Sequence, residues 1–541
     1  MQNRSILKNK LYLYFTEFFS GLAVMAVELG ASRLLAPFFS SSQIVWTIII
    51  GTIMIAMALG NIYGGRSADK DPDPDRLYRR ILIAAVWIAA IPVLGKYIIL
   101  GISAVLVFSV NTNFLIWAAF AACMIIFVFP LFLLGTVTPS LARYTVQSID
   151  ESGKVVGTLG AFNTVGSIIG TFLPTFVTIP AVGTAVSFLI FSGVLLAISL
   201  IYYLSSRIGY KKCIFAVIAF ILCCVFGHNG SFAFWQDDLA YEGESVYNYL
   251  QVKENEEEKA LSTNVLFGVQ SVLIKDDKRL TGMYYDYAMA APFMAGLSGN
   301  DEMDVLILGM GTGTYATQCG RFFGDLNIEG VEIDDKITAL AYEYFELPKD
   351  TNVVTYDGRA FLNSTESLYD VIMVDAYQDI TIPFQMSSVE FFSLVRGHLK
   401  DGGVMTVNMN MRGKSEGSIN QYLSDTISYV FPYVYTIDVP GYTNRVLFAS
   451  VNEDFPERGL ENMELWAEEK DDERSAALVS WMKNIYPDIG RYERGDYLLT
   501  DDKAPVELLG MRVIDEMIKE ETQYYRQVYE EQGLEGLLGA L

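Results

Sequence analysis

Histidine and cysteine are scarce in this chain. Its 541 residues include two histidines, His228 and His398, and five cysteines. Four of the cysteines lie in apolar segments, and Cys319 is alone in the remainder. A zinc cluster, a disulfide framework or a histidine-based triad therefore has too few residues to be built from. We expect a functional site without a metal.

Charged residues are rare in the first part of the chain and abundant in the rest. Residues 1–230 hold 15 Lys/Arg and 8 Asp/Glu, a net charge of +7, whereas the remainder holds 24 and 55, a net charge of −31. The chain is also too long for one ordinary core. We therefore expect separate domains, of which the acidic one repels nucleic acid and attracts cations.

The first 230 residues contain seven apolar stretches of membrane-spanning length. They lie near residues 11–30, 44–64, 81–110, 114–136, 156–178, 183–204 and 213–229. The third is long enough, around Pro92 and Lys96, to be bent or broken, and eight spans is the alternative. We predict a multi-pass α-helical membrane domain whose partner is the lipid bilayer. Glu17, inside the first stretch, is a costly group that marks either helix packing or a substrate path.

From residue 304 onward, short buried runs alternate with helix-like segments. The predicted strands read DVLILG, NIEGVEI, NVVTY, YDVIMVDA and GVMTVNM. Strands separated by helices predict a parallel, doubly wound, Rossmann-like α/β sheet with its ligand at the carboxyl ends of the strands. A smaller β-rich segment precedes it.

Four of these strand ends carry residues suited to a nucleoside. Glycines 309, 311 and 313 follow the first strand, Glu332 ends the second, Asp357 and Gly358 follow the third, and Asp375 ends the fourth. A carboxylate after the second strand can accept both ribose hydroxyls. The dinucleotide fingerprint needs a glycine where Thr314 stands. The pattern thus favours an adenosyl sulfonium ligand over a dinucleotide.

In their order along the chain, these motifs resemble the spermidine synthase or polyamine aminopropyltransferase family, in its membrane-fused bacterial branch. The matching stretches are ESVYNYLQV, GVQS, GxGxG, VEID, DGRAF, YDVIxVDAY, EFF, L-K-x-GGV, NRVLFAS and LLTDDKAPVELL. The resemblance covers roughly residues 240–450 and continues towards the C-terminus.

The resemblance implies a donor, an acceptor and roles for individual residues. The donor would be decarboxylated S-adenosylmethionine and the acceptor a polyamine, with methylthioadenosine as product. Glu332 would hold the ribose, Asp357 the adenine, and Asp375 would orient and deprotonate the amine. Gln270 and Tyr285 match positions that line the pocket, and Tyr442 matches a tyrosine that closes it.

The chain departs from the family pattern at three places. Thr312 stands in the glycine turn where relatives carry an acid, and Gln378, followed by Asp379, stands where they carry a second acid. Asp286 replaces a histidine or glutamine. These changes leave open a methyl- or aminocarboxypropyltransferase that uses intact S-adenosylmethionine. The apolar first 230 residues leave open a second alternative, a polyamine carrier whose acidic domain is a nucleoside-binding sensor. Asp286 and Asp379 could restore the lost charge.

The predicted organisation has four parts. Residues 1–230 form the membrane domain, 231–297 a β-rich substrate-side subdomain, 298–455 the Rossmann-like catalytic domain, and 456–541 an acidic helical extension suited to docking on the enzyme or to a homodimer. Lys/Arg clusters place the N-terminus in the cytoplasm, and seven spans would then leave the acidic domain outside. We nevertheless expect a cell-membrane protein with a cytoplasmic catalytic domain, because the donor argument outweighs the charge count.

Overall fold

The computed structural model describes residue 6 and residues 9–107, 113–146, 149–228, 231–236, 238–265, 268–299, 302–324, 326–376, 382–410, 413 and 415–540. Contacts within the chain separate two compact units, Met1–Trp235 and Gln236–Leu541. We call them the helical unit and the α/β unit.

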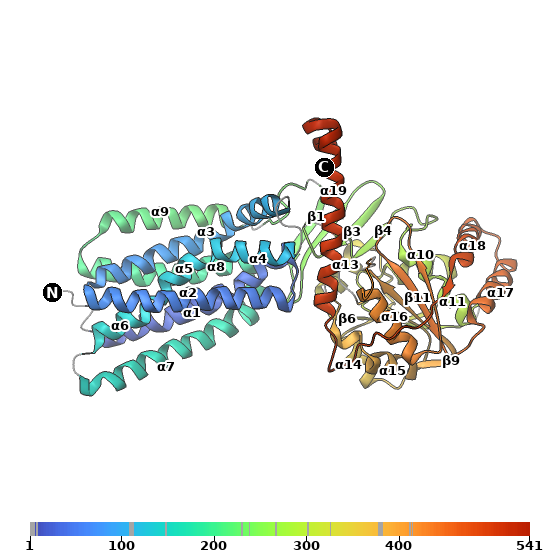
Figure 1. Ribbon diagram of the computed structural model, residues 1–541, viewed down its shortest axis with the longest axis horizontal. Helices are drawn as coiled ribbons and strands as arrows, with labels where there is room; N and C mark the ends of the chain where they lie inside the picture. The colour runs from blue at the N-terminus through green and yellow to red at the C-terminus, as the bar shows by residue number, and fades with distance from the viewer. Residues whose placement is uncertain are drawn as a thin grey trace. The chain divides into compact units, whose positions relative to one another are not determined.

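The helical unit is a bundle of long helices that lie side by side (Figure 1). Its helices are α1 (Lys10–Phe39), α2 (Gln43–Lys70), α3 (Pro74–Val107), α4 (Phe114–Ile126), α5 (Val128–Gly135), α6 (Val137–Thr145), α7 (Ile149–Leu173), the π-helix η2 (Pro174–Thr178), α8 (Ile179–Ser206) and α9 (Tyr210–Gly227). Every apolar stretch predicted to span a membrane coincides with one or two of them.

By length and composition, five helices in the described part of the chain could cross a membrane, or six if the bent pair Phe114–Ile126 and Val128–Thr145 is one span. The count is below the predicted seven because Asp150–Ser206 is one helical stretch of 57 residues that contains two predicted spans. That stretch changes direction at Gly183, where φ is 79° and ψ is 170°. The third stretch, predicted to be long enough to bend or break, forms one helix, α3, with Pro92 inside it.

Glycines let the helices of this unit approach one another closely. A Cβ added to Gly166 would overlap the carbonyl oxygen of Phe18, so the backbones of α7 and α1 are in direct contact there. Gly60 of α2 meets the carbonyl of Phe132 in the same way. Small residues at helix contacts are typical of membrane proteins, where packing replaces the hydrophobic effect.

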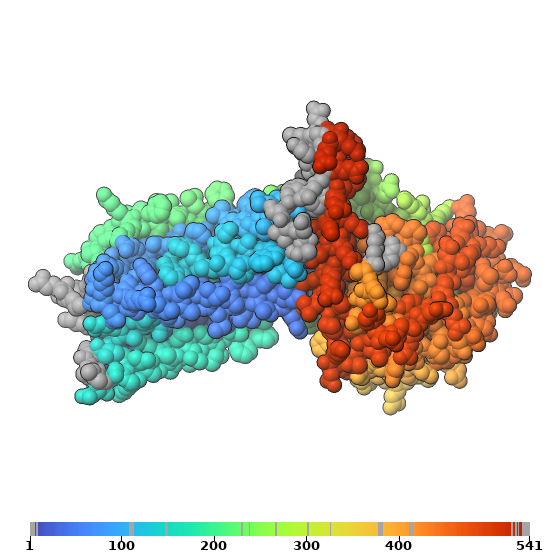
Figure 2. All heavy atoms as spheres, viewed as in Figure 1, coloured from blue at the N-terminus to red at the C-terminus, as the bar shows by residue number. Residues whose placement is uncertain are grey.

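Large apolar side chains cover the outside of the helical unit. Helix α9, green along the upper edge in Figure 2, is an example. Its exposed side chains are Ile214, Phe215, Ile218, Ile221, Leu222, Val225 and Phe226. Soluble proteins rarely expose so continuous an apolar surface.

The α/β unit begins with a small antiparallel sheet, as the fold prediction has it. Its strands are β1 (Leu239–Glu244), β2 (Tyr249–Glu254), β3 (Glu258–Ser262) and β4 (Ser271–Ile274), in that order. Thr314 ties this sheet to the main one, because its hydroxyl donates to the carbonyl of Val272 at 2.8 Å and accepts from the Val272 amide at 3.1 Å.

The main sheet has eight strands in the order β12-β10-β11-β9-β8-β5-β6-β7. They are β5 (Asp304–Leu308), β6 (Asn327–Glu332), β7 (Asn352–Thr355), β8 (Tyr369–Val374), β9 (Leu399–Met409), β10 (Tyr433–Asp438), β11 (Arg445–Ser450) and β12 (Gly490–Arg491). Strands β5 to β9, all predicted from the sequence, are parallel, whereas β10, β11 and β12 add an antiparallel edge that was not predicted. The fold is Rossmann-like. The strand order runs outward from β5 to β7 on one side and from β8 to β9 on the other, so it reverses between β5 and β8.

Helices cover both faces of this sheet. They are α10 (Tyr284–Ala288), α11 (Ala290–Ala295), α12 (Thr314–Phe323), α13 (Asp335–Tyr344), α14 (Gly358–Ser364), the 3₁₀ turn η3 (Phe384–Met386), α15 (Val389–Gly397), α16 (Ile419–Val430), α17 (Phe455–Glu468), α18 (Glu473–Ile485), the 3₁₀ turn η4 (Tyr486–Asp488) and α19 (Val506–Ala540). Trp466 of α17 is fully buried against Phe293 and Phe323. The predicted C-terminal extension therefore begins with helices that belong to the core, and only α19 projects from it (Figure 1).

Candidate functional site

A pocket of about 160 Å³ lies at the carboxyl ends of β5, β6, β7 and β8. This is the edge where open α/β sheets bind ligands, next to the point where the strand order reverses. The pocket is lined by Asn248, Leu261, Thr263, Gln270, Ser271, Gly309, Met310, Gly311, Val331, Glu332, Ile333, Ile337, Tyr356, Asp357, Gly358, Asp375, Ala376, Pro383, Gln385 and Met386. The four predicted strand ends thus meet in one place.

The glycine turn forms one wall of the pocket. Gly309 and Gly311 have φ values of 79° and 57°, in the left-handed region that side chains with a Cβ rarely adopt. A Cβ on Gly309 would lie 2.5 Å from the Cα of Ala376, and one on Gly311 would lie 2.7 Å from the Ser271 hydroxyl. These glycines are therefore required by the protein's own packing, before any ligand is considered.

Glu332 is held in place by backbone donors. Its carboxylate accepts from the Gly311 amide at 2.8 Å and from the Asp334 amide at 3.0 Å. Burial raises the pKa of Glu332 to about 7, and the nearby Asp334 charge adds to the effect. Asp334 accepts in turn from Asn248 at 3.0 Å. The small sheet and the second strand end are thereby connected at this wall.

Asp357 begins helix α14 at the next strand end. One carboxylate oxygen accepts from the Ala360 amide at 2.8 Å, which caps the helix. Beside it, the pocket is flanked by Ile333 and Tyr356, whose side chains are 39% and 51% exposed. The sequence did not single out these two residues, although Ile333 directly follows the predicted Glu332 and Tyr356 directly precedes the predicted Asp357.

Asp375 is held by partners on both carboxylate oxygens. The Tyr284 hydroxyl donates to one oxygen at 2.7 Å, and the Asn408 side-chain amide donates to the other at 2.8 Å. Asn444 in turn donates to Asn408 at 2.9 Å. Burial raises the pKa of Asp375 to about 7, the two donors oppose that rise, and the charge of Glu332 adds to it. The carboxylate can therefore take up a proton near neutral pH.

Tyr284 and Asn408 were missed in the sequence. Asn408 could have been found, because it lies near the end of the fifth predicted strand. Tyr284 could not be distinguished from Tyr285 in the sequence, because the two tyrosines are consecutive. In the structure their rings also lie together, with centroids 4.0 Å apart.

The predicted amine-side residues lie in different places. Gln270 lines the pocket, and its carbonyl accepts from the Tyr285 hydroxyl at 2.9 Å. Asp286 is fully buried and accepts from the amides of Thr281 and Gly282, at 3.1 and 2.6 Å, so that it holds a turn. Burial raises its pKa to about 6.

Three of the remaining predicted residues, Thr312, Gly313 and Tyr442, do not line the pocket. Thr312 is buried, and its amide donates to the Ser271 hydroxyl at 3.2 Å, while its own hydroxyl has no hydrogen-bond partner among the described residues. Gly313 precedes helix α12 with φ of 81°. Tyr442 is 44% exposed, in the turn between β10 and β11. Gln378 and Asp379 lie outside the described residues.

Metal ligands do not gather anywhere in the described residues, where no group of three or more His, Cys, Asp or Glu side chains could hold an ion.

Comparison with known proteins identifies the family. The profile described as "Spermine/spermidine synthase domain" matches residues 288–460. A probable polyamine aminopropyl transferase of Bifidobacterium longum is 49% identical over 355 residues, which cover 64% of this chain and 78% of that protein. The chain belongs to the polyamine aminopropyltransferase family. As a member of this family, the protein is a transferase.

Two further proteins are similar to parts of this chain. The polyamine aminopropyltransferase of Vibrio vulnificus is 26% identical over 310 residues, or 54% of this chain and 98% of that one. A crystal structure of a probable spermidine synthase from Corynebacterium glutamicum covers 48% of this aminopropyltransferase and 97% of its own chain, with 18% identity and a TM-score of 0.35. The Bifidobacterium match covers more of this chain than residues 236–541 can supply, so it extends into the helical unit.

Proposed function

We propose that this enzyme transfers an aminopropyl group from decarboxylated S-adenosylmethionine to a di- or polyamine and releases methylthioadenosine. The observation that carries the proposal is Asp375, a half-buried carboxylate at the pocket wall with both oxygens held by donors and a pKa of about 7. A base of this kind can receive the proton that an amine must lose before it attacks.

The nucleoside of the donor would lie along the strand ends. Glu332 is positioned to accept from the ribose hydroxyls, and Asp357, as the residue that begins α14, can accept from the adenine amino group. Ile333 and Tyr356 offer apolar surface for the adenine ring. Gly309, Gly311 and Gly358 supply backbone at the same wall.

The transfer step is a displacement at carbon. The amine nitrogen forms a bond to the methylene next to the sulfonium sulfur, the carbon–sulfur bond breaks, and its electron pair neutralises the sulfur. The proton that leaves the attacking nitrogen goes to Asp375. Because no group has to be activated beyond this proton transfer, alignment of the donor and the amine supplies much of the remaining acceleration.

The amine would bind on the side of Asp375. Gln270 lines the pocket there, and Tyr285 is attached to it through its hydroxyl. We keep Tyr285, Tyr442, Gln378 and Asp379 as proposed amine contacts. Asp286 is proposed to contribute negative charge behind this wall, since both its oxygens already serve the turn at residues 281–282.

A transferase that uses intact S-adenosylmethionine is the second candidate, and Thr312 is the observation that favours it. An acid in the glycine turn would repel the carboxylate of the intact donor, whereas Thr312 brings a neutral hydroxyl that has no hydrogen-bond partner in the described residues. The carrier alternative has less support, because membership of a transferase family accounts for the acidic α/β unit without a sensor role.

One experiment separates the two donors. The full-length protein, purified in detergent, is given each donor with a panel of diamines, and the products are identified by mass. Methylthioadenosine together with an aminopropylated amine supports the proposal, and S-adenosylhomocysteine or a carboxylated amine supports the second candidate. Failure of both donors to react, with a functional Bifidobacterium relative as positive control, contradicts both.

We also propose that the helical unit integrates the enzyme into the cell membrane, with the α/β unit in the cytoplasm. The apolar length of its helices and the exposed apolar side chains of α9 support the first part. Protease treatment of intact and permeabilised cells tests the second part. Cleavage of the α/β unit by a protease added outside intact cells would contradict a cytoplasmic location.

A further inference from the structure

The segment Tyr492–Lys503, which we call the C-terminal strap, is fastened to three helices of the α/β unit. At its start, Asp425 of α16 accepts from the Tyr492 hydroxyl at 2.8 Å and from the amides of Gly495 and Tyr497 at 2.7 and 3.0 Å. Further along, the Leu499 amide donates to Thr426 at 3.0 Å. The strap therefore has a fixed path before it reaches the pocket side of the sheet.

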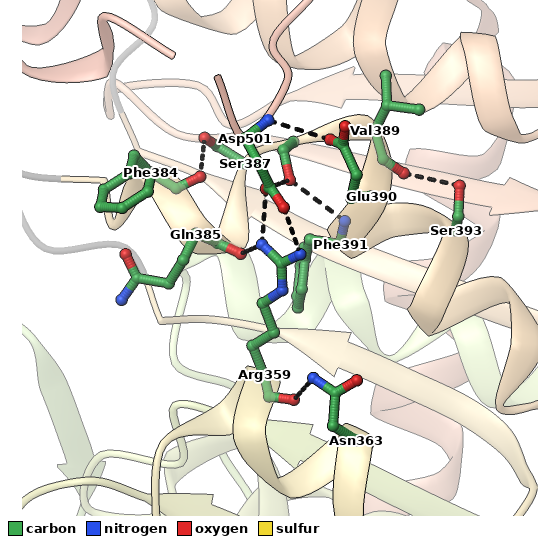
Figure 3. Close-up of polar contacts among 11 residues, drawn as sticks. Arg359, Asn363, Phe384, Gln385, Ser387, Val389, Glu390, Phe391, Ser393 and Asp501 are labelled. Atoms are coloured by element: carbon green, nitrogen blue, oxygen red, sulfur yellow. Dashed lines mark hydrogen bonds and ion pairs between the residues drawn. The ribbon is translucent and has the colours of Figure 1, made fainter. Parts of the chain in front are cut away.

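Near the end of the strap, Asp501 makes four polar contacts (Figure 3). Its two carboxylate oxygens accept from the two terminal nitrogens of Arg359, each at 2.7 Å. One oxygen also accepts from the Ser388 hydroxyl at 2.6 Å, and the Asp501 amide donates to Glu390 at 3.1 Å. A bidentate pair of this kind fixes the plane of the guanidinium and not merely its distance.

Arg359 connects this pair to two parts of the pocket wall. It is the second residue of α14, which Asp357 begins, so its position sets the position of the predicted adenine contact. The same guanidinium donates to the carbonyl of Gln385 at 2.9 Å, and Gln385 lines the pocket. Arg359 itself does not line the pocket, and its side chain points away towards Asp501 (Figure 3).

An exposed ion pair usually contributes little to stability, so the simplest alternative is that this pair has no role in the site. Three observations argue for more. The Arg359 side chain is only 22% exposed, and its geometry is bidentate. The hydrogen bond from Arg359 holds the pKa of Asp501 below its usual range, as expected for a carboxylate that stays charged. The pair also joins residues 142 positions apart, where the strap meets α14 and the start of α15.

We propose that Asp501 and Arg359 are positioning residues that set the adenine end of the donor site, and through it the affinity for the donor nucleoside. The proposal rests on the proposed function, since it assumes that Asp357 and the wall at residues 383–386 face the adenosine. Neither residue touches the reacting atoms, so the pair should govern binding of the donor and leave the chemical step unchanged.

The test measures nucleoside binding directly, with methylthioadenosine as the probe and calorimetry on the detergent-purified full chain. Asp501→Asn should raise the Kd for methylthioadenosine about tenfold and the KM for the donor by a similar factor. The kcat and the KM for the amine should stay within about twofold. Arg359→Lys, which keeps the charge but loses the fork, should give a smaller rise of about threefold, and Asp501→Glu should recover part of the affinity.

Asp370→Asn is the matched control. Asp370 pairs with Lys400 at 2.8 Å, its side chain is 22% exposed, and it lies at the opposite edge of the same sheet. This variant should leave the Kd within twofold. A Kd that is unchanged in Asp501→Asn, a fall in kcat alone, or an equal rise in the control would overturn the proposal.

The outcomes separate this proposal from the proposed function. If the parent protein binds methylthioadenosine but transfers no aminopropyl group, the proposed function fails while the effect of Asp501→Asn on binding still decides the positioning role. If the parent binds neither methylthioadenosine nor S-adenosylhomocysteine, the nucleoside site is wrong and the positioning role is wrong with it.

Discussion

The helical unit and the α/β unit each enclose a carboxylate in different surroundings: Glu17 is fully buried, whereas Asp375 is half-buried. One oxygen of Glu17 accepts from Thr138 at 2.5 Å and Asn163 at 2.8 Å, and its other oxygen has no hydrogen-bond partner among the described residues. Both oxygens of Asp375 have donors, and the carboxylate opens onto a pocket. The bonds of Glu17 join helices α1, α6 and α7, whereas those of Asp375 orient Asp375 itself. The two carboxylates therefore differ in setting, since Glu17 serves contacts between helices and Asp375 lines a pocket.

Of the variants that test this comparison, Asp375→Asn should have the largest effect, a loss of turnover. The amide cannot accept the proton of the attacking amine, so turnover should fall by about 10³-fold, in the range that general bases contribute. Steady-state formation of methylthioadenosine measures the loss. Binding of methylthioadenosine should stay within about threefold of the parent, and full turnover in the variant would remove Asp375 from the reaction.

Gly166→Leu should affect the helical unit alone. The added side chain would meet the carbonyl of Phe18 and force α7 away from α1, at about 2 to 3 kcal/mol. Titration of the detergent-purified protein with SDS, followed by helical circular dichroism, should show earlier unfolding. Folded protein should keep its kcat within twofold. Gly51→Leu, where nothing lies within 4 Å of the added Cβ, is the matched control.

Asp375→Asn should also change how stability depends on pH. The pKa of Asp375 is about 7 in the folded protein against 3.8 ordinarily, so the protonated form is favoured by folding. That contribution is fully present below pH 3.8 and is lost as the pH rises through 7. The variant should therefore gain about 1 to 3 kcal/mol over the parent between pH 5 and pH 8. Equal pH dependence of the two in urea unfolding would show that the aspartate is not buried as a neutral acid.

Glu17→Gln should have the smallest effect. Glutamine keeps an oxygen for Thr138 and Asn163, so unfolding should change by less than about 1 kcal/mol. Turnover and donor affinity should match the parent. A loss of activity in this variant, with Gly51→Leu unaffected, would mean that the two carboxylates are more alike than their contacts indicate.

The sequence was most informative where a strand ends. Apolar runs that stop at Gly309, Glu332 and Asp375 predicted both the parallel strands and the residues that meet at the pocket, because carboxyl ends of parallel strands share one edge. The seven apolar stretches likewise predicted the helices of the first unit. A rule based on local pattern is sufficient for such features, since each is encoded by neighbouring residues.

Features that depend on distant residues were not predictable in this way. Tyr284 reaches Asp375 across 91 positions, and nothing in the letters YYD shows which tyrosine turns towards it. The ion pair of Arg359 with Asp501 and the antiparallel edge strands have the same origin, because register and side-chain direction are set by tertiary packing. The continuity of the two predicted spans around Gly183 was not predictable either: the stretch is helical on both sides of a kink at this residue.

The double hydrogen bond of Thr314 to the Val272 peptide has a consequence for motion. A side-chain hydroxyl here takes the place that a neighbouring strand would otherwise fill, and it lies at the first turn of the helix that follows the glycines. We expect the small sheet and the glycine-turn wall of the pocket to open together, as one cooperative element. The Val272 amide should accordingly exchange its hydrogen as slowly as the centre of the main sheet, even though it belongs to a four-stranded sheet of its own.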